Sequence, residues 1–430
     1  MASLFPFRAL RYDPDRARLA DVVTQPYDKI TPAMQERYYA ASPYNLVRLE
    51  LGKRETEGDV YPAAARHLAD WRKAGILRQD ERPSFYAYSQ RFRVPGSEQH
   101  FERRGVIAAV KLEDYDRGVI FRHEQTLSGP KADRLNLLRA TRTSFGQLFM
   151  LYSDPAQAVE RLLFPASGQQ PEAEVTDEYG VVHRLWVVND PKAIAQAQAL
   201  MAEKQLIIAD GHHRYETALT YRNERRAAAG SAGENAGYER AMMTLVNVDA
   251  EGLVVLPTHR VVHGLAMFDP EQLLRGAKRY FDVEPLPAEL DAAAAMKALA
   301  PADGEMRFLA FCGQRNFLFR ARPEALAALL PDVSPRQRAL DVVVLHRVLL
   351  QKVLGISEAA IREQRNLAYV REAGEAIARV REGRADAAFL MNPVRIEQMR
   401  EVALAGEVMP QKSTDFYPKL LSGLAGYAME

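Results

Sequence analysis

The sequence contains a single cysteine, Cys312, and it has almost no net charge. One cysteine excludes an intrachain disulfide framework and a cysteine-rich zinc site, and it is typical of a reducing compartment. The 57 basic and 56 acidic residues give a net charge of +1, and the sequence has no run of lysine and arginine. Such a balance leaves no electrostatic footprint for DNA or RNA, so we expect no nucleic-acid partner.

Long hydrophobic runs are also missing. An apolar run such as Val342–Leu345 is far too short to span a bilayer, which takes about 20 residues. The first residues, Met1–Arg8, lack the apolar core of a signal peptide, and charged side chains follow at once. These features predict a cytoplasmic protein without a membrane partner.

The composition that remains is that of an ordinary folded protein. Hydrophobic residues make up 47% of the 430 positions, and at about 150 residues per domain this length predicts two or three domains. The alternation of helical and strand patterns predicts an α/β to α+β fold with a mixed sheet core. We expect a catalytic part over residues 1–262, a smaller α+β module over 263–333, and a β-α-β-α unit with a tail over 334–430.

Local patterns predict the main elements. Asn45–Leu51 alternates as a half-buried strand, and Tyr61–Ala74 has the spacing of an amphipathic helix. Leu367–Val370 and Ala387–Met391 are short apolar runs typical of strands. In the centre of the chain, the apolar run 206–208 predicts a strand that turns into a helix ending near residue 226.

The central turn, Asp210–Arg214, concentrates titratable groups on little backbone. The N–H groups at the start of a helix attract anions, phosphate above all. His212, His213 and Arg214 fall in the first turn, and Asp210 is suited to capping, acid–base chemistry or metal binding. The plainer alternative is that Asp210 caps the helix and Gly211 only supplies a positive φ.

Two further stretches carry polar clusters. His123 and Glu124 follow a predicted strand end, and a helix that starts near Lys131 places Arg134 one turn further on. For Lys131 the alternative is a solvated helix face with i,i+3 charge pairs. The pair His259-Arg260 lies at another strand end, which is where open α/β sheets collect their ligands.

The phrase Ala209–Ala218 resembles the signature of a large prokaryotic protein family without an assigned function. The resemblance extends over nearly the whole chain. It includes Phe5–Arg8, Pro26–Asp28, residues 123–141, Pro257–Arg260 and Met409–Thr414.

The piece Gly211–Arg214 is also similar to the G-x-x-R box of the ParB/sulfiredoxin superfamily, which binds nucleotide phosphates at a helix N-terminus. Free serine kinases of that superfamily carry the nearest form, D-G-H-H-R. They transfer a phosphoryl group from a nucleotide to the hydroxyl of L-serine, with a glutamate as general base. The other branches fit less well: sulfiredoxin has a cysteine where His212 stands, and DNA-binding ParB needs a basic domain.

The resemblance therefore implies a ParB/sulfiredoxin-like strand-turn-helix phosphate site and a nucleotide-dependent phosphotransferase that acts on a small-molecule hydroxyl. ATP or ADP would be the donor, free L-serine a candidate acceptor, and Mg²⁺ would bridge phosphate oxygens with Asp210 as a candidate ligand. Glu124 would be the general base, and His123 would orient it. Phosphates or the acceptor would bind to Gly211, His212, His213, Arg214, Lys131, Arg134, His259 and Arg260.

Three other interpretations stay open at this stage. A nucleotide-binding switch or nucleotide hydrolase would use the same box without an amino-acid acceptor. A metal-dependent hydrolase would use Asp210, the two adjacent histidines and Glu124 as ligands, although adjacent histidines suit one metal less well than i,i+4 spacing. A non-catalytic scaffold would leave the polar clusters at three strand ends unexplained. Sequence alone gives neither the acceptor nor the oligomeric state.

Overall fold

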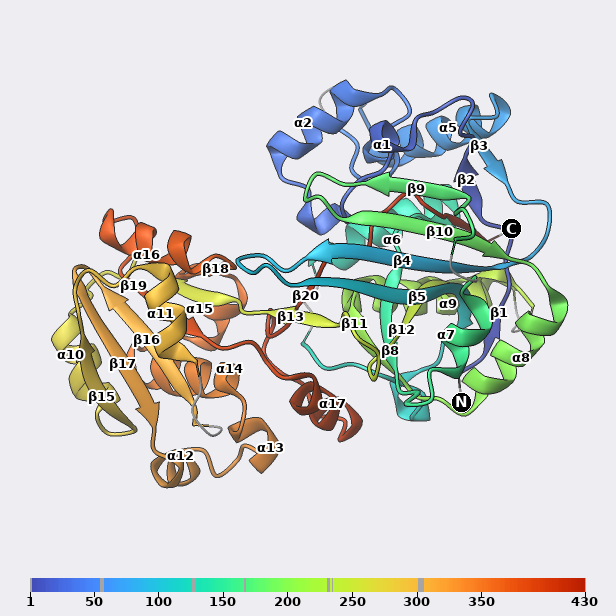
Figure 1. Cartoon of the computed structure of the whole chain (residues 1–430). Helices are drawn as coiled ribbons and strands as arrows, with labels where there is room; N and C mark the ends of the chain where they lie inside the picture. The colour runs from blue at the N-terminus through green and yellow to red at the C-terminus, as the bar shows by residue number, and fades with distance from the viewer. Residues whose placement is uncertain are drawn as a thin grey trace. The chain divides into compact units, whose positions relative to one another are not determined.

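The computed structural model describes residues 2–54, 58–125, 129–165, 168–229, 233, 235–300 and 305–429 (Figure 1). The chain divides into two compact units. Unit 1 comprises residues 1–122, 126–254 and 417–430, and unit 2 comprises residues 123–125 and 255–416. The chain thus leaves unit 1 within strand β13 (Val254–Leu256) and returns to it within strand β20 (Asp415–Tyr417).

Unit 1 is built on a nine-stranded mixed sheet. The strands are β1 (Leu4–Phe5), β4 (Phe85–Arg93), β5 (His100–Lys111), β6 (Ile120–Phe121), β8 (Leu148–Tyr152), β9 (Ala173–Thr176), β10 (Val182–Val188), β11 (Leu206–Asp210) and β12 (Arg240–Asn247). Their order is β6-β11-β8-β12-β5-β4-β10-β9, with β1 paired to β5. β11 lies next to the edge strand β6, to which it runs parallel, and it runs antiparallel to β8. The central turn directly follows the last residue of β11, Asp210. Two short pairs accompany it, β2 (Leu10–Tyr12) with β3 (Leu77–Gln79) and β7 (Thr143–Ser144) with β21 (Tyr427–Ala428).

Unit 1 also contains helices. They are α1 (Leu19–Val22), α2 (Pro32–Ala41), α3 (Val47–Glu50), α5 (Val60–Lys73), α6 (Gly129–Thr141), α7 (Ala158–Leu163), α8 (Pro191–Ala202) and α9 (His212–Ala229), with the 3₁₀ turns η1 (Tyr27–Lys29), η2 (Tyr115–Arg117) and η3 (Gly237–Glu239). Apolar side chains of α7, α8 and α9 pack with strands β5, β8, β11 and β12 in one buried core. The predicted helix 61–74 is confirmed as α5, and the predicted strand-turn-helix is confirmed as β11 and α9.

The expected strand at Asn45–Leu51 is wrong, because these residues form the single helical turn α3. The side chain of Asn45 accepts a hydrogen bond from the N–H of Val47 at 2.9 Å, and this starts the turn. Leu46, Val47 and Leu49 are all buried, so the apolar spacing reflects burial on several sides rather than strand alternation.

Unit 2 contains a six-stranded antiparallel sheet. Its strands are β14 (His259–Val262), β15 (Phe281–Leu286), β16 (Arg307–Cys312), β17 (Arg315–Ala321), β18 (Leu367–Val370) and β19 (Ala387–Met391), in the order β15-β17-β16-β19-β14-β18. Its helices are α10 (Pro270–Ala277), α11 (Ala292–Leu299), α12 (Pro323–Leu329), α13 (Pro335–Arg338), α14 (Asp341–Val344), the π-helical η4 (Leu345–Val353), α15 (Glu358–Arg362), α16 (Ala373–Arg381) and α17 (Ile396–Leu404). α11 and α16 pack on one face of the sheet.

The domain boundaries expected from the sequence do not coincide with the limits of unit 2. The expected boundary between residues 333 and 334 falls inside unit 2, because β19 hydrogen-bonds to both β16 and β14. The expected boundary at residue 262 is also displaced, since β14 belongs to unit 2. The bounds of β18 and β19 themselves are as expected, so the error concerns which strands pair and not where they lie.

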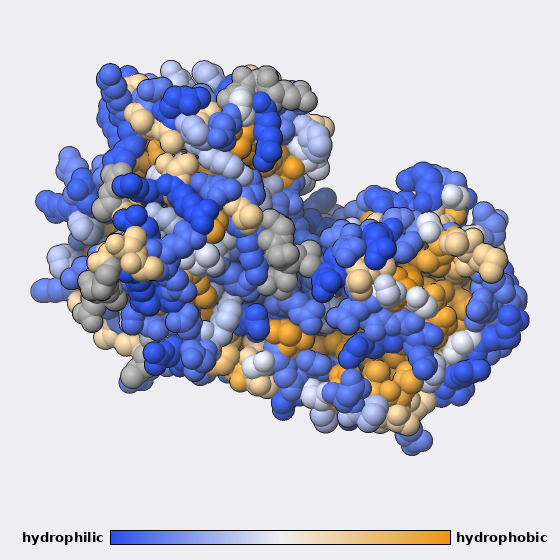
Figure 2. Space-filling model, turned by 180° about the vertical axis from the view of Figure 1, so that it is seen from behind, coloured by the Kyte–Doolittle hydropathy of each residue, from blue (hydrophilic) through white to orange (hydrophobic). Residues whose placement is uncertain are grey.

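The surface is mainly hydrophilic, with hydrophobic side chains reaching it in places (Figure 2). Among the described residues no helix combines the length and the apolar character that a membrane span requires.

Candidate functional site

The turn between β11 and α9 requires glycine at position 211. Gly211 has a φ of +99°, which side-chain-bearing residues rarely adopt. A Cβ atom at this position would lie 3.0 Å from Leu148 Cδ2 and 3.1 Å from the guanidinium carbon of Arg214. The turn therefore lets the Arg214 side chain lie directly against the backbone that starts α9, where helix N–H groups favour an anion.

Arg214 is held on two sides. Its Nη1 donates a short hydrogen bond to the carbonyl of Gln147, and its Nη2 lies 3.5 Å from Asp210 Oδ2. Burial opposes the charged form, but nearby carboxylates, Asp210 first among them, hold the pKa of Arg214 above its ordinary value. The guanidinium is therefore a fixed, permanently charged group at the helix start.

Glu50 of α3 lies beside Arg214 and is only 5% exposed. Its Oε2 is buried and has no hydrogen-bond partner in the described part of the chain. Burial raises the pKa of the Glu50 carboxyl, while the charges of Arg134 and Arg214 oppose this rise. A buried carboxylate with a raised pKa between two arginines is a common feature of functional sites.

These side chains line a cavity of about 70 Å³. Gly146 forms one wall, and a Cβ there would lie 3.2 Å from Glu50 Oε1 and 3.4 Å from Arg214 Nη1. The cavity is far smaller than the roughly 300–1,000 Å³ that enclose a whole small-molecule ligand. It has room for a small polar group that reaches Glu50, and not for a nucleotide.

The two basic residues predicted on α6 differ in position. Arg134 lines the cavity; it bonds to Asp133 at 2.8 Å and stacks on the Tyr27 ring with its guanidinium carbon 4.2 Å from the ring centre. Lys131 forms a short ion pair with Glu216 of α9. This pair joins two helices and is not the i,i+3 pair along one helix face that the sequence suggested, while Arg134 and Arg214 line the same cavity.

Lys419 adds a cation that comes from the far end of the chain. Its Nζ lies 3.8 Å from Asp210 Oδ2, and its side chain is only 9% exposed. Residues 417–430 belong to unit 1, so this lysine and the β11–α9 turn are parts of one compact body.

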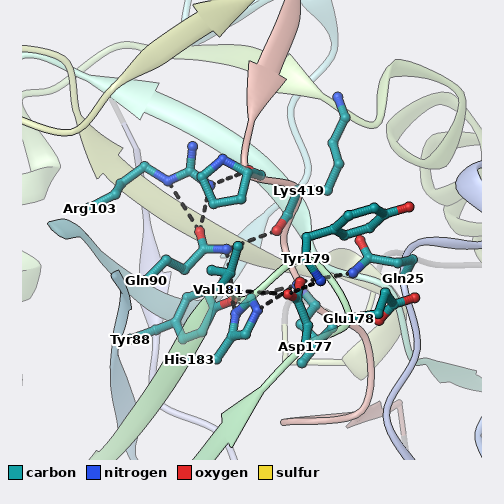
Figure 3. A network of polar contacts seen from close by, with 12 residues as sticks. Gln25, Tyr88, Gln90, Arg103, Asp177, Glu178, Tyr179, Val181, His183 and Lys419 are labelled. Atoms are coloured by element: carbon teal, nitrogen blue, oxygen red, sulfur yellow. Dashed lines mark hydrogen bonds and ion pairs between the residues drawn. The ribbon is translucent and has the colours of Figure 1, made fainter. Parts of the chain in front are cut away.

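A buried hydrogen-bond network holds the backbone of Lys419 in place (Figure 3). Arg103 donates to the carbonyls of Tyr417 and Pro418, and Gln90 donates to the carbonyl of Lys419 at 2.8 Å. The Lys419 side chain extends away from this network (Figure 3). Three consecutive carbonyls are thus fixed, and this fixes where the lysine side chain starts.

The same network includes His183 of strand β10. His183 Nδ1 lies 2.6 Å from the Tyr88 hydroxyl, and its Nε2 lies 3.3 Å from Asp177 Oδ2. All three side chains are buried, so this row of polar groups stabilises the sheet and the returning segment.

Neither histidine of the central turn lines the cavity. His212 is buried at the start of α9 and His213 is partly exposed. In the described residues no group of three or more His, Cys, Asp and Glu side chains is arranged to hold a metal ion. A magnesium ion at Asp210 would therefore take most of its ligands from phosphate oxygens and water.

His123 and Glu124 belong to unit 2, where they contact the segment 412–414. Glu124 accepts hydrogen bonds from the N–H and hydroxyl of Thr414 at 2.9 and 3.0 Å, and from the N–H of Lys412 at 3.2 Å. His123 Nε2 lies 2.8 Å from the Thr414 hydroxyl. Both carboxylate oxygens of Glu124 thus bind the backbone of this segment. Thr126, in the same predicted stretch, lies outside the described residues.

His259 and Arg260 are buried in β14 of unit 2. Arg260 donates from Nη2 to the carbonyl of Lys412 at 3.0 Å and from Nε to His346 at 3.2 Å. Burial lowers the pKa of Arg260 to about 10 and that of His259 to about 4. Arg260 and Glu124 therefore hold the same turn at Lys412, where φ is +58°.

Sequence reasoning missed Glu50 and Lys419. Glu50 lies in the stretch whose alternation suggested a strand, and an alternating Glu in a strand looks like a solvent-facing residue. Lys419 lies in a tail with no recognisable motif. An acidic residue within the run Leu46–Leu51, whose other residues except Arg48 are apolar, was the one signal present for Glu50.

The fold and the site together define a mixed α/β protein with a buried arginine–carboxylate cavity at a strand-turn-helix. The chain belongs to the family described as "Protein of unknown function (DUF1015)", whose model matches residues 4–343.

Several solved structures are similar to this chain. A conserved hypothetical protein from Pyrococcus furiosus has 16% identity and a TM-score of 0.35, covering 74% of this chain and 92% of its own. A free serine kinase in complex with AMP has 15% identity and a TM-score of 0.35, with 73% and 86% covered. SbnI from Staphylococcus aureus, with a C-terminal truncation, has 9% identity and a TM-score of 0.36, with 75% and 88% covered. No curated protein matches the sequence.

Proposed function

We propose that this protein is a nucleotide-dependent phosphotransferase that acts on a small-molecule hydroxyl. The observation that carries the proposal is the buried Glu50 carboxylate, which has one oxygen without a partner and lies against Arg214 at the start of α9. Such a carboxylate is suited to accept a proton, and the helix start beside it is suited to hold phosphate.

The two ligand groups would occupy different places. The donor phosphates would bind at the β11–α9 turn, to the first N–H groups of α9, Arg214 and Lys419. The hydroxyl-bearing end of the acceptor would enter the cavity next to Glu50, which the small volume of about 70 Å³ suits. Arg214 borders both places, since it contacts Asp210 at the turn and lines the cavity.

The transfer then follows from these positions. The acceptor oxygen forms a bond to the terminal phosphorus of the nucleotide, and the bond from that phosphorus to the bridging oxygen breaks. The hydroxyl proton passes to Glu50, and the shortened nucleotide leaves with the bridging oxygen. Arg214 and Lys419 stabilise the charge that develops on the phosphate oxygens. Magnesium, bound with the nucleotide, would supply further charge neutralisation.

Glu124 stays a second candidate for the base. Its carboxylate accepts three hydrogen bonds from residues 412–414, and for this reason we prefer Glu50. Free L-serine, which the D-G-H-H-R likeness suggests, is the first acceptor to test.

The test is to incubate the full chain with ATP or ADP, Mg²⁺ and L-serine, and to follow phosphoserine by phosphorus NMR. We expect turnover that Glu50→Gln lowers by about 10²–10⁴-fold, the range typical of a general base. Glu160→Gln is the matched control, because Glu160 is also buried in unit 1 and its pKa is also raised by burial, but it lies outside the cavity.

The outcomes separate the alternatives. Turnover that falls in Glu124→Gln and not in Glu50→Gln would assign the base to Glu124. Nucleotide hydrolysis at a rate that serine and other hydroxyl compounds do not change would show a hydrolase instead. No nucleotide binding at all, in a folded protein, would remove the proposal.

A further inference from the structure

Unit 2 contains a cavity of about 600 Å³, which the proposed function does not use. This volume lies inside the range of roughly 300–1,000 Å³ that is typical of pockets for small ligands. Much of its wall is apolar or aliphatic. The apolar lining residues are Met306, Ala321, Pro323, Leu326, Pro335, Ala339 and Pro393.

Four charged side chains also line this cavity, and two of them serve the fold. Arg338 donates to the carbonyls of Leu330 and Val333 at 3.1 and 2.7 Å. Glu305 pairs with Arg307 at 2.5 Å. These contacts fix the walls and leave Asp341, whose carboxyl also accepts a hydrogen bond from the lining residue Asn392, and Arg395 as the two other charged residues of the lining.

Asp341 and Arg395 differ in what they offer a ligand. Asp341, at the start of α14, is a carboxyl whose pKa burial raises to about 7, while the Arg395 charge acts in the opposite direction. Arg395 is the N-cap of the nine-residue helix α17, and Gln398 of its first turn also lines the cavity. The Arg395 end therefore favours an anion, from the side chain and from the helix N–H groups.

We propose that unit 2 binds a free α-amino acid with an apolar side chain in this cavity. The ligand ammonium group would pair with Asp341, its carboxylate with Arg395 and the start of α17, and its side chain with the apolar wall. Opposite charges on the lining of a largely apolar pocket of this size match a zwitterion with an apolar body. This site is separate from the residues of the proposed phosphotransferase, so either proposal can fail alone.

The test is calorimetric titration of the full chain with L-leucine and two analogues that each lack one charge. 4-Methylpentanoate lacks the ammonium group, and 3-methylbutylamine lacks the carboxylate. We expect L-leucine to bind about tenfold or more tighter than either analogue, because a charge-assisted hydrogen bond contributes about 1.5–3 kcal/mol. Equal affinity for all three, or no binding of L-leucine at millimolar concentration, would overturn the proposal.

Substitutions of residues that line the cavity test whether L-leucine binds there. Asp341→Asn should remove the preference for L-leucine over 4-methylpentanoate, and Ala339→Phe should fill the cavity and remove binding of both. Asp332→Asn, a surface carboxylate of the same unit, is the control and should bind like the unchanged protein. Circular dichroism verifies that each variant is folded. Leucine binding that survives both Asp341→Asn and Ala339→Phe would place the ligand elsewhere and overturn the assignment.

Discussion

Each unit contains a cavity in which a carboxyl group lies near arginine. In unit 1 Glu50 lies between Arg134 and Arg214, and in unit 2 Asp341 lies near Arg395. In both cases burial raises the pKa of the carboxyl and the arginine charge opposes it. Glu160 is also buried with a raised pKa but lines neither cavity, so it is the cavity and the nearby arginine that lead us to propose a role in binding or chemistry for Glu50 and Asp341.

Lys419 gives a prediction at the scale of one residue. Lys419→Met should weaken ATP binding by about tenfold, since it removes a cation next to the proposed phosphate position. The free energy of unfolding should change by less than about 1 kcal/mol, because an ion pair at 3.8 Å contributes little. The measurements are ATP titration and urea unfolding. Lys204→Met is the control, because Lys204 pairs with Asp154 at 3.6 Å; equal effects of the two substitutions on ATP binding would refute the role of Lys419.

Asp341 gives a second prediction, on pH. Its pKa is about 7 in the folded chain and near 4 in the unfolded chain, so the folded state holds the proton more tightly. Its contribution to stability is fully present below pH 4 and is lost as the pH rises through 7. Asp341→Asn should remove this slope and stabilise unit 2 at pH 8 by at least about 1 kcal/mol.

Cys312 supplies the measurement for this pH prediction. It lies in unit 2, is only 2% exposed, and burial raises the pKa of its thiol to about 12. Its reaction with a dipyridyl disulfide therefore follows the opening of unit 2 between pH 5 and 8. The same slope in Asp341→Asn and in the unchanged protein would contradict the prediction.

At the scale of single residues the sequence predicted only part of the site. Gly211 and Arg214 were identified because a strand, a turn glycine and a helix are all local patterns. Glu50 and Lys419 were not, because they reach the site through tertiary contacts with segments distant in the chain. The ion pair of Lys131 could not be predicted either, since its partner Glu216 lies on another helix and no sequence pattern reveals such a pairing.

The turn between β11 and α9 gives a prediction at the scale of one element. Gly211→Ala should destabilise unit 1 by about 1–2 kcal/mol for the left-handed backbone alone, and more because its Cβ would meet Leu148 and Arg214. ATP binding should be lost in the protein that remains folded. Gly118→Ala is the control, with a φ of +66° and no atom within 4 Å of the added Cβ. Thermal unfolding and ATP titration are measured for both variants. The backbone strain is common to both substitutions and the Cβ contacts occur only at position 211, so equal effects of the two substitutions would contradict a role for these contacts.

The bounds of elements with local sequence signals could be predicted, but the order in which strands pair in a sheet could not. α2, for example, begins at a local signal, because the Thr31 side chain accepts a hydrogen bond from the N–H of Met34 at 3.2 Å. β18 and β19 have the expected bounds, but nothing in their sequences shows that β14 lies between them. The strand prediction for Asn45–Leu51 was wrong because a run of buried residues has a similar sequence in a strand and in a short buried helical turn such as α3.

At the scale of the whole molecule, residues 417–430 complete unit 1. Ser422 exchanges backbone hydrogen bonds with Thr24, Gly426 does so with Leu10, and β21 pairs with β7. Removing residues 417–430 should lower the stability of unit 1 by about 3 kcal/mol or more, at about 1 kcal/mol for each buried hydrogen bond lost.

The two tryptophans, Trp71 and Trp186, both lie in unit 1, so their fluorescence follows its unfolding in urea. Cys312 reactivity follows unit 2 in the same samples and should change less. An unchanged fluorescence transition in the truncated chain would show that the returning segment is dispensable.

The return of the chain to unit 1 also sets an order for biosynthesis. Residues 255–416 leave the ribosome as a nearly complete unit 2, which can fold while the nascent chain is still growing. Unit 1 begins first, and all nine strands of its sheet precede residue 255, but it is complete only after residues 417–430 have been translated. Lys419 reaches Asp210 only in that final stage, so a stalled or truncated nascent chain would contain the β11–α9 turn without Lys419 beside it.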